Sequence, residues 1–332
     1  MSHTKRPVLN RRRFLAASLS GGLSVATPAL AQDLPFSGPI RLISGFSAGG
    51  SQDTLARLVG EAIGKATGRA VIVENRTGGG SRLSAQNVRD ATPDGSHILV
   101  ANIGTMILIP IQYQDVRYDA FADFVPLVRS TDYPAVIATG PQTGAKDFRA
   151  LIDWLKANPS KASYGSPAPG SIPHMYAIEL GRQLGIDFGV VQYRGGTPML
   201  PDLLSGNLAV GGAAPLDFLA LHNAGSLQII AQSGTERQAS IKDVPTFAEL
   251  GVKGLDSNGW NGFFVAKGTP KPIADLYERI ILAALREPGL RQKLTDLGFI
   301  VRDLGSAAFA KTMADDREFW TRMIKEANLK VQ

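Results

Sequence analysis

The sequence predicts an α/β protein of two lobes, with the second lobe inserted into the first. Short apolar segments with β character alternate with amphipathic helical segments, which is the pattern of strands joined by helices. Small residues, above all glycine and serine, follow several of the predicted strands. A late β segment, 258–265, is expected to return the chain to the first lobe. We place the first lobe at 32–130 and 248–332, and the second at 131–247.

The composition is that of a folded chain with room for two cores. It has 332 residues, of which 44% are hydrophobic and 7% aromatic. Cysteine is absent, which excludes disulfides, thiolate metal sites and a cysteine nucleophile. No two histidines have the spacing of metal ligands. We therefore expect neither a metal nor a cofactor.

The first 31 residues have the features of an export signal. Arg11-Arg12-Arg13 forms a twin-arginine pattern, a short apolar run follows, and Ala29-Leu30-Ala31 supplies a cleavage site. We expect export to the periplasm by the twin-arginine route; an uncleaved anchor is the alternative. Five of the 35 basic residues and none of the 29 acidic ones lie in this segment, so the remainder has a net charge of +1. That balance gives no indication of nucleic-acid binding.

The first unit of the chain joins a strand, a small-residue loop and a helix. The apolar run 40–43 predicts the strand and 44–51 the loop, and apolar residues spaced at helical intervals over 55–63 predict the helix. Glycines allow a ligand to approach the backbone, and the free N–H groups of a helix start attract anions. The sequence therefore predicts an anion site here that uses no lysine and suits a carboxylate or a phosphate.

Two further strands complete this part of the first lobe. We predict strands at 69–75 and 98–102, with a helix over 83–91 between them. Asn102, Gly104 and Thr105 follow the second of these strands, and open parallel sheets bind ligands at the carboxyl ends of strands. The glycines at 78–80 match a dinucleotide fingerprint only in part, so we interpret them as a structural loop. Short strands at 125–128 and 135–138 are expected to lead into the second lobe.

The second lobe repeats the alternation, with small-residue loops after its strands. Each loop is expected to face a cleft between the lobes, where small ligands usually bind. The predicted elements are helices at 148–155, 176–184, 199–204 and 216–222, strands at 163–165, 190–193, 208–210 and 229–231, and loops at 166–174, 194–197 and 211–215. Helices at 272–286, 290–297 and 307–327 are expected to cover the first lobe.

One motif suggests catalysis. Residues 45–49 match the G-x-S-x-G nucleophile elbow, with Ser47 as the nucleophile. His97, His174 and His222 are the histidines that follow it. His222 lies five residues from Asp217 on one predicted helix, which does not suit an acid and a base from separate loops. A serine hydrolase is therefore the remote alternative, and we expect no catalytic residue. Arg194 is either a solvated charge or a clamp for a carboxylate.

Several short motifs follow one another in a characteristic order along the chain. They lie at 39–43, 46–53, 73–80, 93–95, 164–174, 193–196, 243–246, 260–262 and 268–270. In their order and spacing, over nearly the whole chain after the export signal, they resemble the tripartite tricarboxylate transporter substrate-binding proteins, the Bug family of bacterial periplasmic receptors. The resemblance implies a type II periplasmic-binding-protein fold without catalysis. It also implies a monomer that closes on a small organic carboxylate and delivers it to the two membrane subunits of a tripartite transporter; a chemosensory role through a sensor protein is the alternative.

The resemblance also implies where the ligand lies. Backbone N–H groups and waters would hold its carboxylate between loops 46–53 and 166–171. The ligand-binding residues that we expect are Phe46, Ser47, Ala48, Gly49, Gly50, Ser51, Asp53, Asn102, Gly104, Thr105, Ser166, Gly170, Ser171, His174, Tyr193, Gly195, Gly196, Thr197, Ala213 and Ala214.

The chain departs from the family pattern at one wall of the expected site. Ala209 and the apolar run 211–214 stand where many members carry acidic residues. The partner for a ligand ammonium group is then missing, which favours an organic acid without an α-amino group, aromatic acids included. Asp217, one helical turn later, is the residue that could replace the missing acid.

Overall fold

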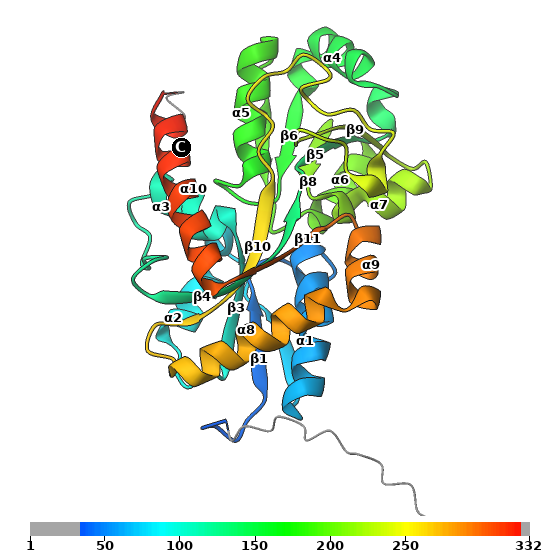
Figure 1. The fold of residues 1–332 in the computed structure, drawn as a ribbon. Coiled ribbons are helices and arrows are strands. Elements are labelled where there is room, and N and C mark those ends of the chain that lie inside the picture. The colour runs from blue at the N-terminus through cyan, green and yellow to red at the C-terminus, as the bar shows by residue number, and fades with distance from the viewer. Residues whose placement is uncertain (1–33, 327–332) are drawn as a thin grey trace, which may run out of the picture.

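The computed structural model describes residues 34–326, so the predicted export signal lies outside the described residues. The chain forms two lobes, each built on one sheet, which lie one above the other in Figure 1. The six-stranded sheet of the first lobe has the order β11-β4-β10-β3-β1-β2, and the five-stranded sheet of the second has the order β7-β6-β8-β5-β9. The predicted fold class, with its inserted second lobe, is confirmed.

The first sheet combines parallel and antiparallel strands. β1, β2 and β3 run parallel, whereas β10 is antiparallel to β3 and β4, and β11 is antiparallel to β4. The carboxyl ends of β1 and β3 therefore lie at one edge of the sheet, which faces the second lobe (Figure 1). The bounds of these strands are β1 (Ile40–Ser44), β2 (Val71–Asn75), β3 (His97–Asn102), β4 (Phe124–Tyr133), β10 (Gly259–Ala266) and β11 (Ile300–Gly305).

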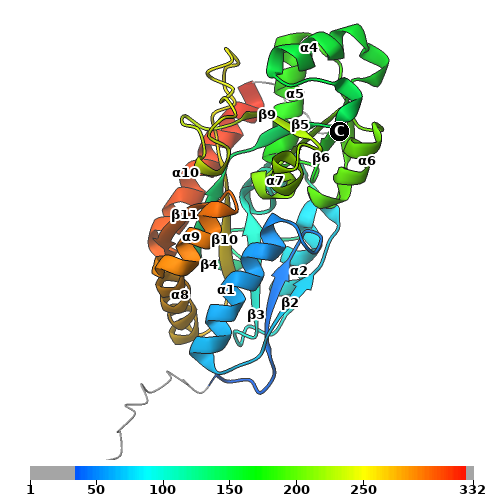
Figure 2. The same ribbon diagram turned by 90° about the vertical axis from the view of Figure 1, so that its right-hand side faces the viewer.

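Helices cover both faces of this sheet because its strands are apolar on both sides. Ile40 and Leu42 of β1 are buried in one core with α1 and α8, and Ile43 is buried in another with α2 and α10. Figure 2 shows α1 and α8 side by side. The helices are α1 (Ser51–Thr67), α2 (Arg82–Asp90), α3 (Ile109–Gln112), α8 (Lys271–Arg286), α9 (Pro288–Asp296) and α10 (Ser306–Glu326). None of the helices in residues 34–326 is long and apolar enough to cross a membrane.

The second sheet is smaller and also combines parallel and antiparallel strands. β6 is parallel to β7 and β8, and β5 is antiparallel to β8 and β9. Its elements are β5 (Val136–Thr139), β6 (Ser163–Ser166), β7 (Gly189–Gln192), β8 (Val210–Ala213), β9 (Gln228–Gln232), α4 (Phe148–Ala157), α5 (Ile172–Leu184), α6 (Leu200–Ser205) and α7 (Pro215–Asn223).

Several elements differ from the sequence-based expectation. α5 begins at Ile172 rather than 176, because a proline in the first helical turn is compatible with the helix. β8 extends through the glycines that we expected in a loop; the buried Tyr164 side chain fills the space beside Gly212, where a Cβ atom would collide with its hydroxyl. β4 has ten residues instead of four, and β11 and the helical turns at 104–112 were not predicted.

The chain passes between the lobes at two places. It leaves the first sheet after Tyr133 and enters the second at Val136, and it returns between Gln232 and Gly259. Ala135 N–H donates to Ser233 Oγ at 2.9 Å, which ties the two connections together. β4 continues past the predicted boundary at 130/131, and 247/248 lies between β9 and β10. The predicted lobe boundaries themselves stay a prediction.

Candidate functional site

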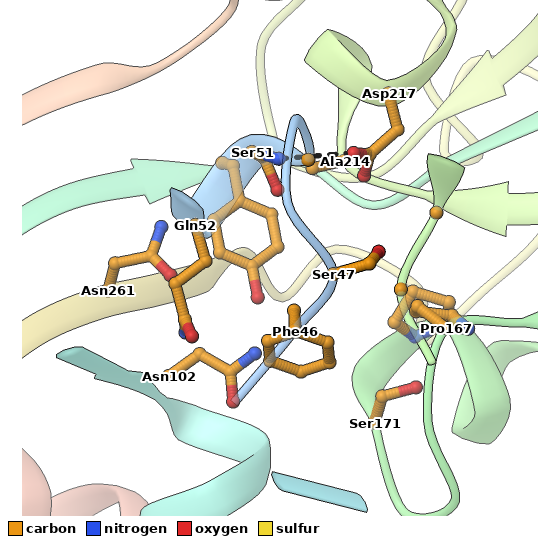
Figure 3. Close-up of a pocket in the computed structure, with 15 residues that line it drawn as sticks. Phe46, Ser47, Ser51, Gln52, Asn102, Pro167, Ser171, Ala214, Asp217 and Asn261 are labelled. Atoms are coloured by element: carbon orange, nitrogen blue, oxygen red, sulfur yellow. Dashed lines mark hydrogen bonds between the residues drawn. The ribbon is translucent and has the colours of Figure 1, made fainter. Parts of the chain in front are cut away.

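A pocket of about 480 Å³, counting the part open to solvent, lies between the two lobes. Both lobes supply its walls from loops at the ends of their strands, as Figure 3 shows. Clefts between domains are a preferred place for small ligands. The residues that line it are Phe46, Ser47, Gly50, Ser51, Gln52, Asn102, Tyr133, Pro167, Ser171, Pro173, Gly195, Gly196, Ala214, Asp217 and Asn261.

Three helices begin at the pocket. The residues that precede them, Gly50 before α1, Ser171 before α5 and Ala214 before α7, all line it. A helix start carries a partial positive charge because its first N–H groups have no partner within the helix. The lining contains no lysine, arginine or histidine. These helix starts are therefore the positive groups that the lining offers to an anion.

The loop after β1 is held in shape by Asp53. This buried carboxylate accepts hydrogen bonds from Gly49 N–H at 2.9 Å, from Asn75 Nδ2 at 3.0 Å and from two Arg57 nitrogens at 2.9 Å. Asn75 Nδ2 also donates to Phe46 O at 2.9 Å. Burial would raise the pKa of Asp53, but the hydrogen bonds from Arg57, Gly49 and Asn75 outweigh it and lower the pKa below its usual value. Asp53 thus supports the loop and does not line the pocket.

Replacing Asp53 by alanine is expected to lower the free energy of unfolding by about 2–3 kcal/mol, because the hydrogen bonds to a buried charged group are lost. Urea denaturation at pH 7 measures this. The exposed pair of Lys271 and Asp275 has the same i,i+4 spacing, and Asp275→Ala should cost less than about 0.5 kcal/mol. Since the pKa of Asp53 is lowered, the difference between wild type and variant should shrink as the pH falls below about 4. An unchanged difference at low pH would contradict this assignment.

Gln52 presents a buried hydrogen-bond donor without a partner. Its side-chain oxygen accepts hydrogen bonds from Ser44 Oγ at 2.9 Å and from Gly45 N–H at 3.2 Å. These two bonds identify the oxygen of the amide, so the remaining terminal atom is the amide nitrogen. That nitrogen is buried and has no partner among the described residues, although Gln52 is only 3% exposed. In Figure 3 the side chain extends from α1 toward Asn102. Buried donors are normally paired, so this nitrogen is a group that an acceptor on a ligand would satisfy.

Asn102, Tyr133 and Asn261 add further neutral polar groups to the wall formed by the first lobe. Asn102 Oδ1 accepts from Thr105 N–H at 3.0 Å and Thr105 Oγ1 at 3.1 Å, which leaves its amide nitrogen to face other groups. Burial raises the pKa of Tyr133, so its hydroxyl stays protonated and can donate. β10 pairs with β3 in the register that places Asn261 opposite Asn102.

The loop after β6 forms the facing wall. Ser171 Oγ accepts from His174 N–H at 3.3 Å and so caps α5. Gly170 N–H donates to His174 Nδ1 at 3.0 Å, and burial lowers the pKa of His174. His174 is therefore a neutral group that fixes the loop.

Contacts between the lobes close the pocket. Ser47 N–H donates to Arg194 O at 3.1 Å, and Ser51 N–H donates to Asp217 Oδ1 at 3.1 Å. Arg194 reaches the site through its backbone and does not line it. Burial raises the pKa of Asp217 to about 6, and the hydrogen bonds from Ser51 act in the opposite direction. Asp217 is thus an acidic group of the second lobe that contacts the start of α1 in the first.

The structure divides the predicted site residues into two groups. The residues that line the pocket are Phe46, Ser47, Gly50, Ser51, Asn102, Ser171, Gly195, Gly196 and Ala214. The residues that the structure places outside the lining are Ala48, Gly49, Asp53, Gly104, Thr105, Ser166, Gly170, His174, Tyr193, Thr197 and Ala213.

Some residues of the second group support the lining instead of forming it. Thr105 orients Asn102, and Tyr193 Oη donates to Asp202 Oδ2 at 2.6 Å, away from the pocket. Ala48 and Gly49 are exposed, and Ala213 is buried in the core of the second lobe. Whether any predicted residue contacts a ligand stays a prediction.

Six lining residues were not predicted from the sequence, and only some of them carry a local signal. Gln52 shares a helical stripe with the buried Leu55, Ala56 and Val59, and a polar residue on such a stripe can be noticed from the sequence. The other residues that were missed are Tyr133, Pro167, Pro173, Asp217 and Asn261. Asp217 appeared there only as a substitute for a missing acid, and the structure places it in the lining. The chain therefore does supply an acidic group at the wall where we expected none.

The Ser47 hydroxyl has no hydrogen-bond partner among residues 34–326, although it is buried. The nucleophile of a serine hydrolase is activated by a neighbouring base. Within the described part of the chain, the match to the nucleophile elbow is thus not accompanied by the base that such an enzyme needs.

Comparison with known proteins places this chain in a family of receptors. A family profile described as "Tripartite tricarboxylate transporter family receptor" matches residues 55–329. BugT of Bordetella pertussis is 26% identical over 309 residues, which cover 93% of this chain and 94% of BugT. A solved structure described as a periplasmic transporter is 31% identical, with a TM-score of 0.85, and the match covers 89% of this chain and 99% of that one.

A relative with a bound ligand is also similar over most of its length. MatC from Rhodopseudomonas palustris, solved with bound malate, is 26% identical with a TM-score of 0.81, and the match covers 86% of this chain and 98% of MatC. Family and fold are thus those of solute-binding proteins and not of enzymes. The chain belongs to the tripartite tricarboxylate transporter receptor family and is a periplasmic solute-binding receptor.

Proposed function

We propose that this receptor binds a small organic carboxylate in the pocket between its lobes and delivers it to the two membrane subunits of a tripartite transporter. The observation that carries the proposal is the buried amide nitrogen of Gln52, which has no partner among the described residues and lies in the lining. A carboxylate oxygen is an acceptor that would satisfy it. The malate bound by MatC supports the same ligand class.

The recognition that we propose uses neutral groups. Gln52, Asn102 and Tyr133 would donate hydrogen bonds to the carboxylate from the first lobe. The start of α5 would add favourable potential, since a helix start is equivalent to roughly half a positive charge, whereas the starts of α1 and α7 also face the carboxylate of Asp217. A site made of fixed dipoles stabilises an anion without a lysine or an arginine, as helix starts do in other anion sites.

Ligand binding would favour the closed arrangement of the lobes. The lining comes from both lobes, so a ligand makes its full set of contacts only when they are together. A ligand shifts a conformational equilibrium by the difference in its affinity for the two states. The closed receptor would then be the form that the transporter recognises. This recognition would take place in the periplasm, to which the predicted twin-arginine signal directs the receptor.

Thermal unfolding with a panel of mono-, di-, tri- and aromatic carboxylates tests the proposal. A ligand at 100 times its Kd stabilises the native state by about 2.7 kcal/mol, so the matching acid should raise Tm by several degrees. The fully amidated forms of the same acids, which carry no carboxylate, serve as controls and should leave Tm unchanged. If no acid raises Tm, mass spectrometry of the denatured sample decides: a co-purified acid supports the proposal, and its absence contradicts it.

A further inference from the structure

Asp217 is the charged side chain among the fifteen residues that line the pocket. It lies in the first turn of α7, in the second lobe. Its Oδ1 accepts a hydrogen bond of 3.1 Å from Ser51 N–H, at the start of α1 in the first lobe, and Figure 3 shows this bond across the pocket. The carboxylate of Asp217 therefore occupies the position where the start of α1 would otherwise hold an anion from outside.

The neighbouring backbone leaves room for this carboxylate. A Cβ atom at Gly196 would collide with the carboxyl group of Asp217, although Gly196 has φ −70°, which any residue can adopt. A Cβ atom at Gly50 would lie 3.4 Å from Asp217 Oδ1. The glycine at 196 is thus needed for space, and the space is filled by the carboxyl group.

Asp217 can stay ionised in this position without a cationic partner. It lies near the starts of two helices, its own α7 and α1, and both favour a negative charge. Burial raises its pKa to about 6, so at pH 8 the group is ionised. Tyr133 is the titratable group that faces it, and burial raises the pKa of that phenol, which stays neutral.

Resting on the carboxylate function proposed above, we infer that Asp217 determines the charge of the ligand: the receptor takes acids with a single carboxylate. That carboxylate would be held by Gln52 and Asn102, and the other end of the ligand would present a hydrogen-bond donor to Asp217. A second carboxylate at that end would meet the carboxylate of Asp217, and the lining offers no lysine, arginine or histidine to separate them. Like charges at such short range repel strongly where water is excluded.

Two pairs of ligands of equal size isolate this effect. Succinate and succinamate differ only in that an amide replaces one carboxylate, and glutarate and glutaramate differ in the same way. Calorimetric titrations at pH 8 should give a Kd at least about tenfold lower for the monoamide of each pair with the wild-type receptor. Asp217→Asn should remove or reverse this preference. Asp153→Asn, an exposed carboxylate on α4 with 73% of its side chain accessible, makes the same change in total charge and should leave the preference intact.

A second variant keeps the test decisive if Asp217→Asn folds poorly. Gly196→Ala keeps all charges but forces the carboxyl group of Asp217 to move, and it should also reduce the preference for the monoamide. If the dicarboxylates bind the wild type as tightly as the monoamides, and both variants leave that ratio unchanged, the inference is wrong and the proposed function stands. If none of the four compounds binds the wild type or the variants, the inference is wrong for acids of this size, and the thermal-unfolding panel decides the proposed carboxylate function separately.

Discussion

Gln52→Glu is expected to weaken carboxylate binding by at least about 100-fold, which is about 2.7 kcal/mol. The new carboxylate would keep one oxygen on Ser44 Oγ and Gly45 N–H, where the amide oxygen lies now. Its second oxygen would replace the donor that we assign to the ligand. A lost hydrogen bond and a new like charge then act together, and two like charges about 4 Å apart near a protein surface repel by about 4 kcal/mol. Calorimetric titration with the acid that raises Tm most measures the effect.

Two controls separate this effect from misfolding and from net charge. The variant should keep the circular dichroism spectrum of the wild type because the buried acceptor is retained, although the buried charge lowers its Tm. Gln114→Glu makes the same charge change at an exposed position outside the pocket and should bind normally. A Kd for Gln52→Glu within about threefold of the wild type would show that Gln52 does not contact the carboxylate.

Trp260→Ala is expected to have the largest effect on stability, a loss of about 3–5 kcal/mol. Trp260, on β10, is 1% exposed, and its ring packs edge-on against Phe309 at 5.0 Å between centroids. Its Nε1–H donates to Asp316 Oδ2 at 2.8 Å. Truncation removes the packing of β10 against α10 and leaves a largely buried carboxyl group without this donor. Urea denaturation monitored by circular dichroism measures the loss.

Variants that remove one contribution at a time test the explanation. Trp260→Phe keeps much of the ring packing but not the hydrogen bond and should cost about 1–2 kcal/mol. Trp154→Ala removes a tryptophan side chain that is only partly buried on α4. It should lower the free energy of unfolding clearly less than Trp260→Ala does. A loss below about 1 kcal/mol for Trp260→Ala would mean that this packing does not hold β10 in place.

The sequence predicts the features that depend on near neighbours in the chain. The apolar run of β1 and the helical stripe of α1 are local patterns, and both elements were predicted within a few residues. The position of small-residue loops at the carboxyl ends of strands follows from connectivity, whereas the placement of the ligand between 46–53 and 166–171 came from the resemblance to a known family. Nine of the residues predicted in this way line the pocket.

The remaining lining depends on contacts between distant segments. Asn261 reaches the pocket because β10 pairs with β3, and Asp217 does so because α7 in one lobe begins opposite α1 in the other. No spacing rule connects these residues. In the same way, polar residues such as Asp53 and His174 have the chemistry of ligand contacts, and only their hydrogen bonds to the loops assign them to support. The fold class can thus be predicted from local patterns in this sequence, whereas the chemistry of the pocket cannot.

In the proposed site, neutral donors and helix starts recognise a carboxylate group as such. Calorimetric titration of the wild-type receptor compares one acid that raises Tm with the fully amidated form of the same acid, which carries no carboxylate. We expect one binding site per chain and an affinity for the acid at least about 100-fold higher than for the amide. Equal affinities for the acid and its amide would contradict this proposal, because the site would then recognise the shape of the ligand and not its charge.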